Sequence, residues 1–390
     1  MMNRVRMGMV GGGEGAFIGE IHRAAARLDG EVELVCGAFS SNPEVSHRTG
    51  ARLGLPPQRV YSSWQDMLVG ESRLPAESRA EFVSIVTPND LHLPVAQGAL
   101  RAGFHVLSDK PATLSLAEAQ TLATEVARTQ RCYALTHTYL GYPLAGEARL
   151  RVLGGDIGSL RRVEVEYPQG WLATRLEESG NPQALWRTDP QRAGAGGSVG
   201  DIGVHAFNLA EYVTGRRVTR LCAALDITVP GRKLDDQASA LLRFDNGAAG
   251  ILTASQISAG EENDLTIRVY GETGGVIWSH RDPNSLQLLS LNSARRTLRA
   301  GNNVADLHAS TRAQCRTPAG HPEGYIEAFA NIYRLFATDV RRSSENETGA
   351  AAPSSPATIE AALRGMAFIE SMVASSAAGQ QWVELAAAEP

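Results

Sequence analysis

The chain of 390 residues is poor in the features that mark several large classes of protein. Its four cysteines lie far apart and form no Cys-x-x-Cys pair, which argues against a disulfide framework or a bound metal and favours a reducing compartment. It has no run of about 18 apolar residues, so we expect no membrane span. The first residues lead directly into an apolar strand, without the long apolar region of a secretory signal. We therefore expect a cytoplasmic protein.

Charge is also modest. Charged residues make up 20% of the chain, and the net charge is −5. This balance gives no general attraction to nucleic acids or anionic membranes, so we expect neither as a partner and predict a small-molecule ligand. Apolar residues make up 43% of the chain, which is ordinary for a globular protein, and the length favours two domains.

The first 140 residues alternate short apolar strands with helical segments. The expected strands are residues 4–10, 32–39, 80–88, 104–111 and 132–140. Short apolar strands joined by helical crossovers are typical of a parallel sheet covered on both faces. The sequence therefore predicts an α/β domain over residues 1–140.

After about residue 145 the strands become longer and alternate polar with apolar residues. They span residues 160–171, 220–230, 238–257 and 265–280, with hairpin turns predicted at FDNG and GETGG. Residues 341–356 are polar and predict a loop or partly disordered segment before a last helix at 358–376. We predict that residues 141–390 form an α+β domain with a large, mainly antiparallel sheet.

A glycine-rich loop, MGMVGGGEGAFIGEIH (7–22), joins the first strand to the first helix. It fits the pattern Gly-x-Gly-x-x-Ala, with Gly19 available as the close-packing glycine. In this pattern one glycine permits a tight turn, another lets the backbone approach a pyrophosphate, and the helix N-terminus faces the negative charge. Because strand, loop, helix and a second strand follow in order, we predict a Rossmann dinucleotide-binding domain. Its candidate contacts here are Gly11, Gly13, Ala16, Phe17 and Ile18.

The acidic residue that usually ends the second strand of such a domain is missing. The strand runs into Phe39-Ser40-Ser41-Asn42, where an Asp or Glu would hold a ribose 2′-hydroxyl and repel a 2′-phosphate. The hydroxyls of Ser40 and Ser41 could serve either ribose, and no arginine lies nearby before Arg48. Both NAD and NADP stay open as cofactors, with NAD favoured.

Two further strand ends carry polar residues at the edge where ligands of open α/β sheets bind. The candidate cofactor contacts there are Thr87, Pro88, Asn89, His92, Asp109 and Lys110. Pro111 holds the preceding lysine in an extended conformation. Taken alone, Lys110 could equally be a surface residue that ends a strand.

The segment AGAGGSVGDIGVH (193–205) combines glycines with an aspartate and a histidine four residues apart. If this segment is helical, Asp201 and His205 share one face. Taken singly, Asp201 is a good helix N-cap and His205 an ordinary histidine at a helix edge.

Together these motifs resemble the Gfo/Idh/MocA family, the group of glucose–fructose oxidoreductase, inositol 2-dehydrogenase and related sugar dehydrogenases. The resemblance rests on the glycine loop, TPNDLH (87–92), SDKP (108–111), WRTDP (186–190) and AGAGGSVGDIGVH, and it extends to HPEGYIEAF (321–329) and GQQWVEL (379–385). The family usually has Glu-Lys-Pro where this chain has Asp109-Lys110-Pro111. It often has His-Asn where this chain has His137-Thr138, which removes an amide that could bind a sugar hydroxyl.

The resemblance implies a catalytic set of Lys110, Asp201 and His205. His205 would take the proton of the reacting hydroxyl, Asp201 would hold that hydroxyl, and Lys110 would stabilise the developing alkoxide. A positioned base contributes roughly 10²–10⁴-fold in rate. We expect the glycines before Asp201 to let the backbone approach the nicotinamide.

Other candidates surround this set. Trp186 and Arg187 would form a wall against the nicotinamide or substrate, with ordinary domain packing as the alternative. Gln169 lies with Tyr167 and Trp171 on a strand that could floor the pocket, and His321 and Tyr325 begin a helix that could close it. The candidate substrate contacts are Lys110, His137, Gln169, Arg187, Asp201, His205 and His321.

The implied function is an NAD(P)-dependent oxidoreductase that moves a hydride between the nicotinamide and a secondary hydroxyl of a sugar, sugar derivative or cyclitol. The alternative is a redox-neutral, NAD-dependent glycoside hydrolase that oxidises the sugar ring transiently. A non-enzymatic dinucleotide-binding regulator is disfavoured, because it would not need Lys110 and His205. The resemblance also implies a homodimer or homotetramer, formed through the open face of the second sheet.

Overall fold

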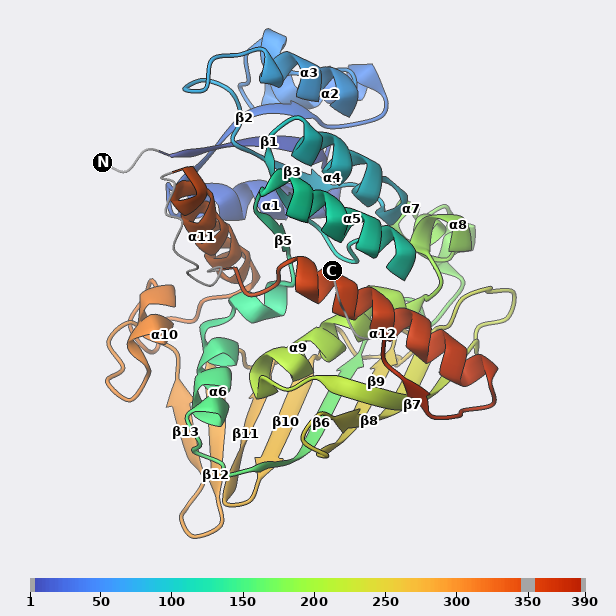
Figure 1. Ribbon diagram of the computed structural model, residues 1–390, viewed down its shortest axis with the longest axis vertical. Coiled ribbons are helices and arrows are strands. Elements are labelled where there is room, and N and C mark those ends of the chain that lie inside the picture. The colour runs from blue at the N-terminus through green and yellow to red at the C-terminus, as the bar shows by residue number, and fades with distance from the viewer. Residues whose placement is uncertain (1–3, 345–354, 387–390) are drawn as a thin grey trace.

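The computed structural model describes residues 4–344 and 355–386 and contains two sheets (Figure 1). Within these residues, five strands form a sheet in the order β2-β1-β3-β4-β5, and every neighbouring pair is parallel. The strands are β1 (Val5–Gly11), β2 (Val32–Ala38), β3 (Phe82–Val86), β4 (His105–Ser108) and β5 (Tyr133–Leu135). This confirms the predicted Rossmann-type sheet.

Helices cover both faces of the first sheet because successive strand residues point to opposite sides. Phe82 and Val86 belong to the core shared with α1 and α11, whereas Val83 and Ile85 belong to the core shared with α4 and α5. The helices around this sheet are α1 (Phe17–Leu28), α2 (Pro43–Arg52), α3 (Trp64–Ser72), α4 (His92–Arg101), α5 (Leu116–Thr129) and α11 (Tyr325–Ser344).

The second sheet has nine strands among the described residues, in the order β13-β12-β11-β10-β6-β9-β8-β7-β14. All its pairs are antiparallel except β6 with β9, which confirms a large, mainly antiparallel sheet. The strands are β6 (Leu160–Pro168), β7 (Val218–Asp226), β8 (Gln237–Phe244), β9 (Ala249–Ser255), β10 (Thr266–Gly271), β11 (Gly274–Ser279), β12 (Ser285–Ser290), β13 (Arg296–Arg299) and β14 (Val383–Glu384). Both predicted hairpin turns are present, between β8 and β9 and between β10 and β11.

Three helices pack on one face of this second sheet, as Figure 1 shows. They are α6 (Pro143–Leu153), α9 (Val204–Thr214) and α12 (Ile359–Ala377). Burial alternates along β8, where Ala240 and Leu242 are buried and Leu241 and Arg243 are exposed. Residues on the opposite face of the sheet therefore face solvent.

After the second sheet is complete, the chain returns to the first one. Helix α11 packs along α1, α12 lies against α5 as well as β7, and Leu135 N donates to Ala357 O at 2.8 Å. Helices α11 and α12, which the prediction assigned to the second domain, thus contribute to the core around the first sheet. The predicted domain boundary between residues 140 and 141 stays a prediction.

Two local predictions need correction. The last strand of the first sheet ends at Leu135 rather than at residue 140, because Thr138–Gly141 turns into a 3₁₀ helix. Residues 341–344 continue α11 instead of forming a loop, and 345–354 lie outside the described residues. In the ranges that the structure describes, no helix combines the length and apolarity needed to cross a bilayer.

Candidate active site

A cavity of about 1190 Å³ opens between the two sheets, at the carboxyl ends of β1, β3, β4 and β5. Ligands of open α/β sheets bind at this edge, and drug-sized ligands usually occupy about 300–1,000 Å³. Most of the candidates predicted from the sequence line it. They are Gly11, Gly13, Ala16, Phe17, Ile18, Ser40, Ser41, Thr87, Pro88, Asn89, Asp109, Lys110, Gln169, Trp186, Arg187, Asp201 and His205.

The glycine loop at one end of the cavity has the close packing that a pyrophosphate cradle needs. Gly11 has a φ of +85°, and a Cβ there would lie 2.7 Å from Val86 O. A Cβ on Gly13 would lie 2.6 Å from Phe39 O, and one on Gly19 would lie 2.4 Å from the Cα of Gly12. Helix α1 then begins without a side-chain cap, which leaves its first N–H groups for an anion. The loop therefore fits a dinucleotide.

Lys110 and Asp201 meet across the cavity. The Lys110 Nζ lies 3.0 Å from Asp201 Oδ1 and also donates to the Asp201 carbonyl. The other carboxylate oxygen accepts from Arg187 Nε at 3.1 Å and from Gln256 Nε2 at 2.8 Å. Burial alone would raise the pKa of Asp201, but Arg187 and Lys110 hold it well below the usual range. The carboxylate is thus ionised and orients Lys110, and it does not accept a proton at neutral pH.

His205 enters the cavity from the first turn of α9. Burial lowers the pKa of His205 well below its usual value, and the Lys110 charge lowers it further. Its Nδ1 lies 3.3 Å from the Nδ1 of His137, whose pKa burial lowers to about 3, with Lys110 adding to the effect. Both imidazoles are therefore neutral at pH 7. When the Nδ1–H of His205 is the donor in this pair, its Nε2 keeps a lone pair that can accept a proton.

Gly194 and Gly197 of the glycine-rich run before Asp201 pack against protein, and the run is absent from the cavity wall. A Cβ on Gly197 would lie 2.1 Å from Asp235 O, and one on Gly194 would lie 3.2 Å from Leu114 O. Asp235 caps the run by accepting from Gly197 N at 2.6 Å, Ser198 Oγ at 2.6 Å and Val199 N at 2.8 Å. The expectation that these glycines approach the nicotinamide is corrected accordingly.

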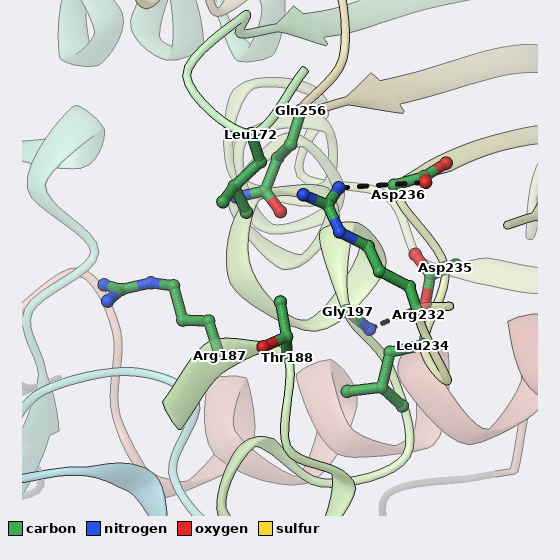
Figure 2. A pocket seen from close by; sticks show the side chains of 9 residues that line it. All are labelled: Leu172, Arg187, Thr188, Gly197, Arg232, Leu234, Asp235, Asp236 and Gln256. Carbon is green, nitrogen blue, oxygen red and sulfur yellow. Dashed lines mark hydrogen bonds and ion pairs between the residues drawn. The ribbon is translucent and has the colours of Figure 1, made fainter. Parts of the chain in front are cut away.

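Asp201 itself lies in a π-helical turn, Val199–Gly203, that continues into α9. Figure 2 shows the second, small cavity beside this turn, with Arg187 and Gln256 on one side and Asp235 and Arg232 on the other. It measures about 10 Å³, enough for one water molecule. Arg187 and Gln256, which bind the Asp201 carboxylate, thus also line this small cavity together with Asp235 and Arg232.

Three predicted site residues lie away from the main cavity wall. The ring nitrogens of His92 lie 2.7 Å from Pro111 O and 3.0 Å from Thr87 O, so the ring is turned to the protein backbone and does not line the cavity. His137 contacts His205 and does not itself line the cavity. His321 is exposed and precedes α11, whereas Tyr325 lines the cavity.

Several lining residues had no signal in the sequence. At the end farthest from the glycine loop, Asn263 Nδ2 donates to Tyr139 OH at 3.1 Å, and Gln169 Nε2 donates to Asn263 Oδ1 at 2.6 Å. His280 also lines this end. These residues come together only when the second sheet pairs β6 with β10 and β10 with β11.

Comparisons with known proteins agree with this geometry. Residues 5–137 match a family model described as an oxidoreductase family with an NAD-binding Rossmann fold. Residues 146–277 match the model of the GFO/IDH/MocA C-terminal domain. Fold and site thus define a dinucleotide-binding oxidoreductase, and the chain belongs to the Gfo/Idh/MocA family.

Similar proteins cover nearly the whole chain. The uncharacterised oxidoreductase YfiI of Bacillus subtilis is 30% identical over 383 residues, which is 97% of this chain and 96% of that protein. A solved oxidoreductase from Sinorhizobium meliloti is 41% identical, with a TM-score of 0.85 over 98% of this chain and 100% of that one. A solved inositol dehydrogenase homologue from Azotobacter vinelandii, complexed with NADH and myo-inositol, is 31% identical, with a TM-score of 0.90 over 98% of each chain.

Proposed function

We propose that the protein is a dehydrogenase that oxidises a secondary hydroxyl of a cyclitol, sugar or sugar derivative with NAD⁺. The observation that carries the proposal is the convergence of Lys110, Asp201 and His205 in one cavity with a glycine loop fit for a dinucleotide. The Azotobacter vinelandii homologue, which holds NADH and myo-inositol, supports the same substrate class.

The charges of the site assign one role to each residue. A nicotinamide cofactor held by the glycine loop would supply the acceptor for the hydride of the carbinol carbon. Neutral His205 accepts the hydroxyl proton at Nε2, so a ketone is formed. The Lys110 ammonium donates a hydrogen bond to the reacting oxygen while negative charge develops on it. Ionised Asp201 holds Lys110 in place through the 3.0 Å contact.

The far end of the cavity is suited to a ligand with several hydroxyls. The ring nitrogens of His280 already pair with Tyr142 OH and Asn263 O, but Gln169 and Asn263 supply amide groups there. Such groups donate and accept hydrogen bonds, which matches the mixed needs of a polyol. We assign Gln169 and Asn263, with Arg187, to substrate binding.

We also propose a homodimer or homotetramer formed through the open face of the second sheet. Cys222, Leu241 and Ile251 are neighbours in one row across β7, β8 and β9, and Leu241 is 47% exposed. Leu241→Glu should lower the molar mass measured by light scattering during gel filtration. An unchanged mass would exclude this face as the interface.

The proposed activity is tested with NAD⁺, with NADP⁺ and with a panel of inositols, free sugars and chromogenic glycosides. The expected result is a rise in reduced-nicotinamide absorbance with a polyol, absent in Lys110→Ala and His205→Ala. Release of aglycone without a net absorbance change would overturn the proposal in favour of the redox-neutral hydrolase. The relatives reported above give that alternative no support.

A further inference from the structure

The adenosine end of the cavity, where NAD and NADP differ, is built in an unusual way. The second strand supplies no carboxylate there, and the cavity wall carries Ser40 and Ser41 instead. The Ser40 Oγ accepts from Asn42 N at 3.1 Å, so its own hydroxyl hydrogen remains free to donate. Such hydroxyls can bind the ribose of NAD or the 2′-phosphorylated ribose of NADP. They therefore do not explain a preference for one of the two cofactors.

A carboxylate reaches this end from the glycine loop. Glu14 lines the cavity, and its backbone N donates to Thr49 Oγ1 of α2 at 3.1 Å. Because Gly13 packs against Phe39 O, just beyond β2, the loop lies beside the point where the ribose-binding acid of other Rossmann domains stands. Glu14 therefore brings a negative charge to the cavity that Ser40 and Ser41 also line.

The same carboxylate binds two arginines of α2. Arg52 Nη1 lies 2.9 Å from Glu14 Oε1, and Arg48 Nε lies 3.4 Å from Glu14 Oε2. Glu14 lines the cavity, whereas Arg48 and Arg52 do not. The first charge that a 2′-phosphate would meet is thus negative, and the guanidinium groups that could bind it are already paired.

We propose that Glu14 selects NAD over NADP, by repelling a 2′-phosphate and by holding Arg48 and Arg52 away from it. This deepens the proposed function, because it names the residue behind the NAD preference assumed there. The arginine side chains are 59% and 64% exposed, so they can reorient once the Glu14 carboxylate is gone. Removing the Glu14 carboxylate therefore frees the guanidinium groups of Arg48 and Arg52, which bind phosphate oxygens well.

The test measures dissociation constants of NAD⁺ and NADP⁺ by calorimetry, without any sugar, for the wild type and Glu14→Gln. We expect NADP⁺ to bind about tenfold more tightly to the variant, as expected for charge-assisted contacts, with NAD⁺ changed less than about twofold. The gain in NADP⁺ affinity should become smaller near 1 M salt, where the Debye length falls to about 3 Å. It should also vanish in Glu14→Gln/Arg48→Ala/Arg52→Ala.

Glu44→Gln is the matched control, because Glu44 is an exposed carboxylate on α2 that does not line the cavity. An unchanged NAD⁺/NADP⁺ ratio in Glu14→Gln, or weaker NADP⁺ binding, would overturn the inference. If the expected shift occurs but no polyol is oxidised, the inference stands and the proposed dehydrogenase fails. If polyols are oxidised and the shift is missing, only the inference fails.

Discussion

Lys110 and His205 contribute opposite kinds of chemistry to one cavity, a fixed positive charge and a neutral base. We predict that His205→Asn lowers kcat/KM by roughly 10²–10⁴-fold, because a positioned base is lost, while NAD⁺ binding is retained. The measurement is initial rates together with calorimetric NAD⁺ affinity. His321→Gln, outside the cavity and exposed, is the control and should leave both unchanged. A His205→Asn variant with full activity would remove His205 from the mechanism.

His137 acts on the reaction through His205. Burial comes first among the effects that lower the pKa of His205, but the neighbouring His137 lowers it as well. Replacing His137 by Asn should raise the pKa of His205, so the acid limb of the pH profile of kcat/KM should move to higher pH. An acid limb that stays in place or moves down would contradict this positioning role.

Among secondary-structure elements, the π-helical turn before α9 depends on one buried side chain. Asp235 accepts three hydrogen bonds at its start. Asp235→Ala would leave the buried Val199 N–H and the half-buried Gly197 N–H without their partner, so we expect a loss of about 1–3 kcal/mol in the free energy of unfolding. Activity should fall too, because the same turn carries Asp201.

Urea unfolding and initial rates measure both effects. The matched control is Asp189→Ala, which removes the single capping hydrogen bond that Asp189 Oδ1 accepts from Gln191 N at the short helix α8 (Pro190–Ala193). If the two variants lose equal stability, Asp235 is an ordinary cap and the turn does not depend on it.

The sequence predicted a structural element best where all residues of its motif lie in one short stretch of the chain. The close packing of Gly19 against Gly12 in the glycine loop follows from such a local pattern. Asp235 and Gln256 were missed because each lies more than 30 residues from the turn it supports, and no spacing rule links them. The extra residue of a π turn also leaves no signature in helical periodicity.

For the whole molecule, buried histidines make folding sensitive to mild acid. Burial lowers the pKa of His22 and His105 to about 4 each and that of His137 to about 3. In the unfolded chain these groups titrate near 6.5. As the pH falls below 6.5, the unfolded state binds protons that the native state does not, so the free energy of unfolding decreases. Each histidine contributes about 1.4 kcal/mol per pH unit, down to its native pKa.

Urea midpoints at pH 7.5, 6.5 and 5.5 test this prediction. The midpoint should change little above pH 6.5 and fall below it. His105→Asn should make that fall shallower, whereas His47→Gln, an exposed histidine, should leave it unchanged. Equal slopes in the wild type and His105→Asn would show that other groups cause the acid sensitivity.

The two-sheet architecture follows from sequence because strand length and alternation differ between the two halves of the chain. The packing of α11 against the first sheet does not follow from the sequence. Periodicity identifies an amphipathic helix but not the surface that the helix covers. The same limit applies to the site. Lys110, Asp201 and His205 stand in motifs, whereas Asn263 and His280 reach the cavity only through the pairing of distant strands.

The central claim is that a carbon-bound hydrogen of a polyol passes to NAD⁺ in this cavity. Its most direct test is incubation with NAD⁺ and myo-inositol deuterated at its ring carbons, followed by mass spectrometry of the cofactor. We predict one deuterium in each molecule of reduced cofactor, with none formed by Lys110→Ala or His205→Ala. Reduced cofactor without deuterium, or label transfer that survives both substitutions, would contradict the claim.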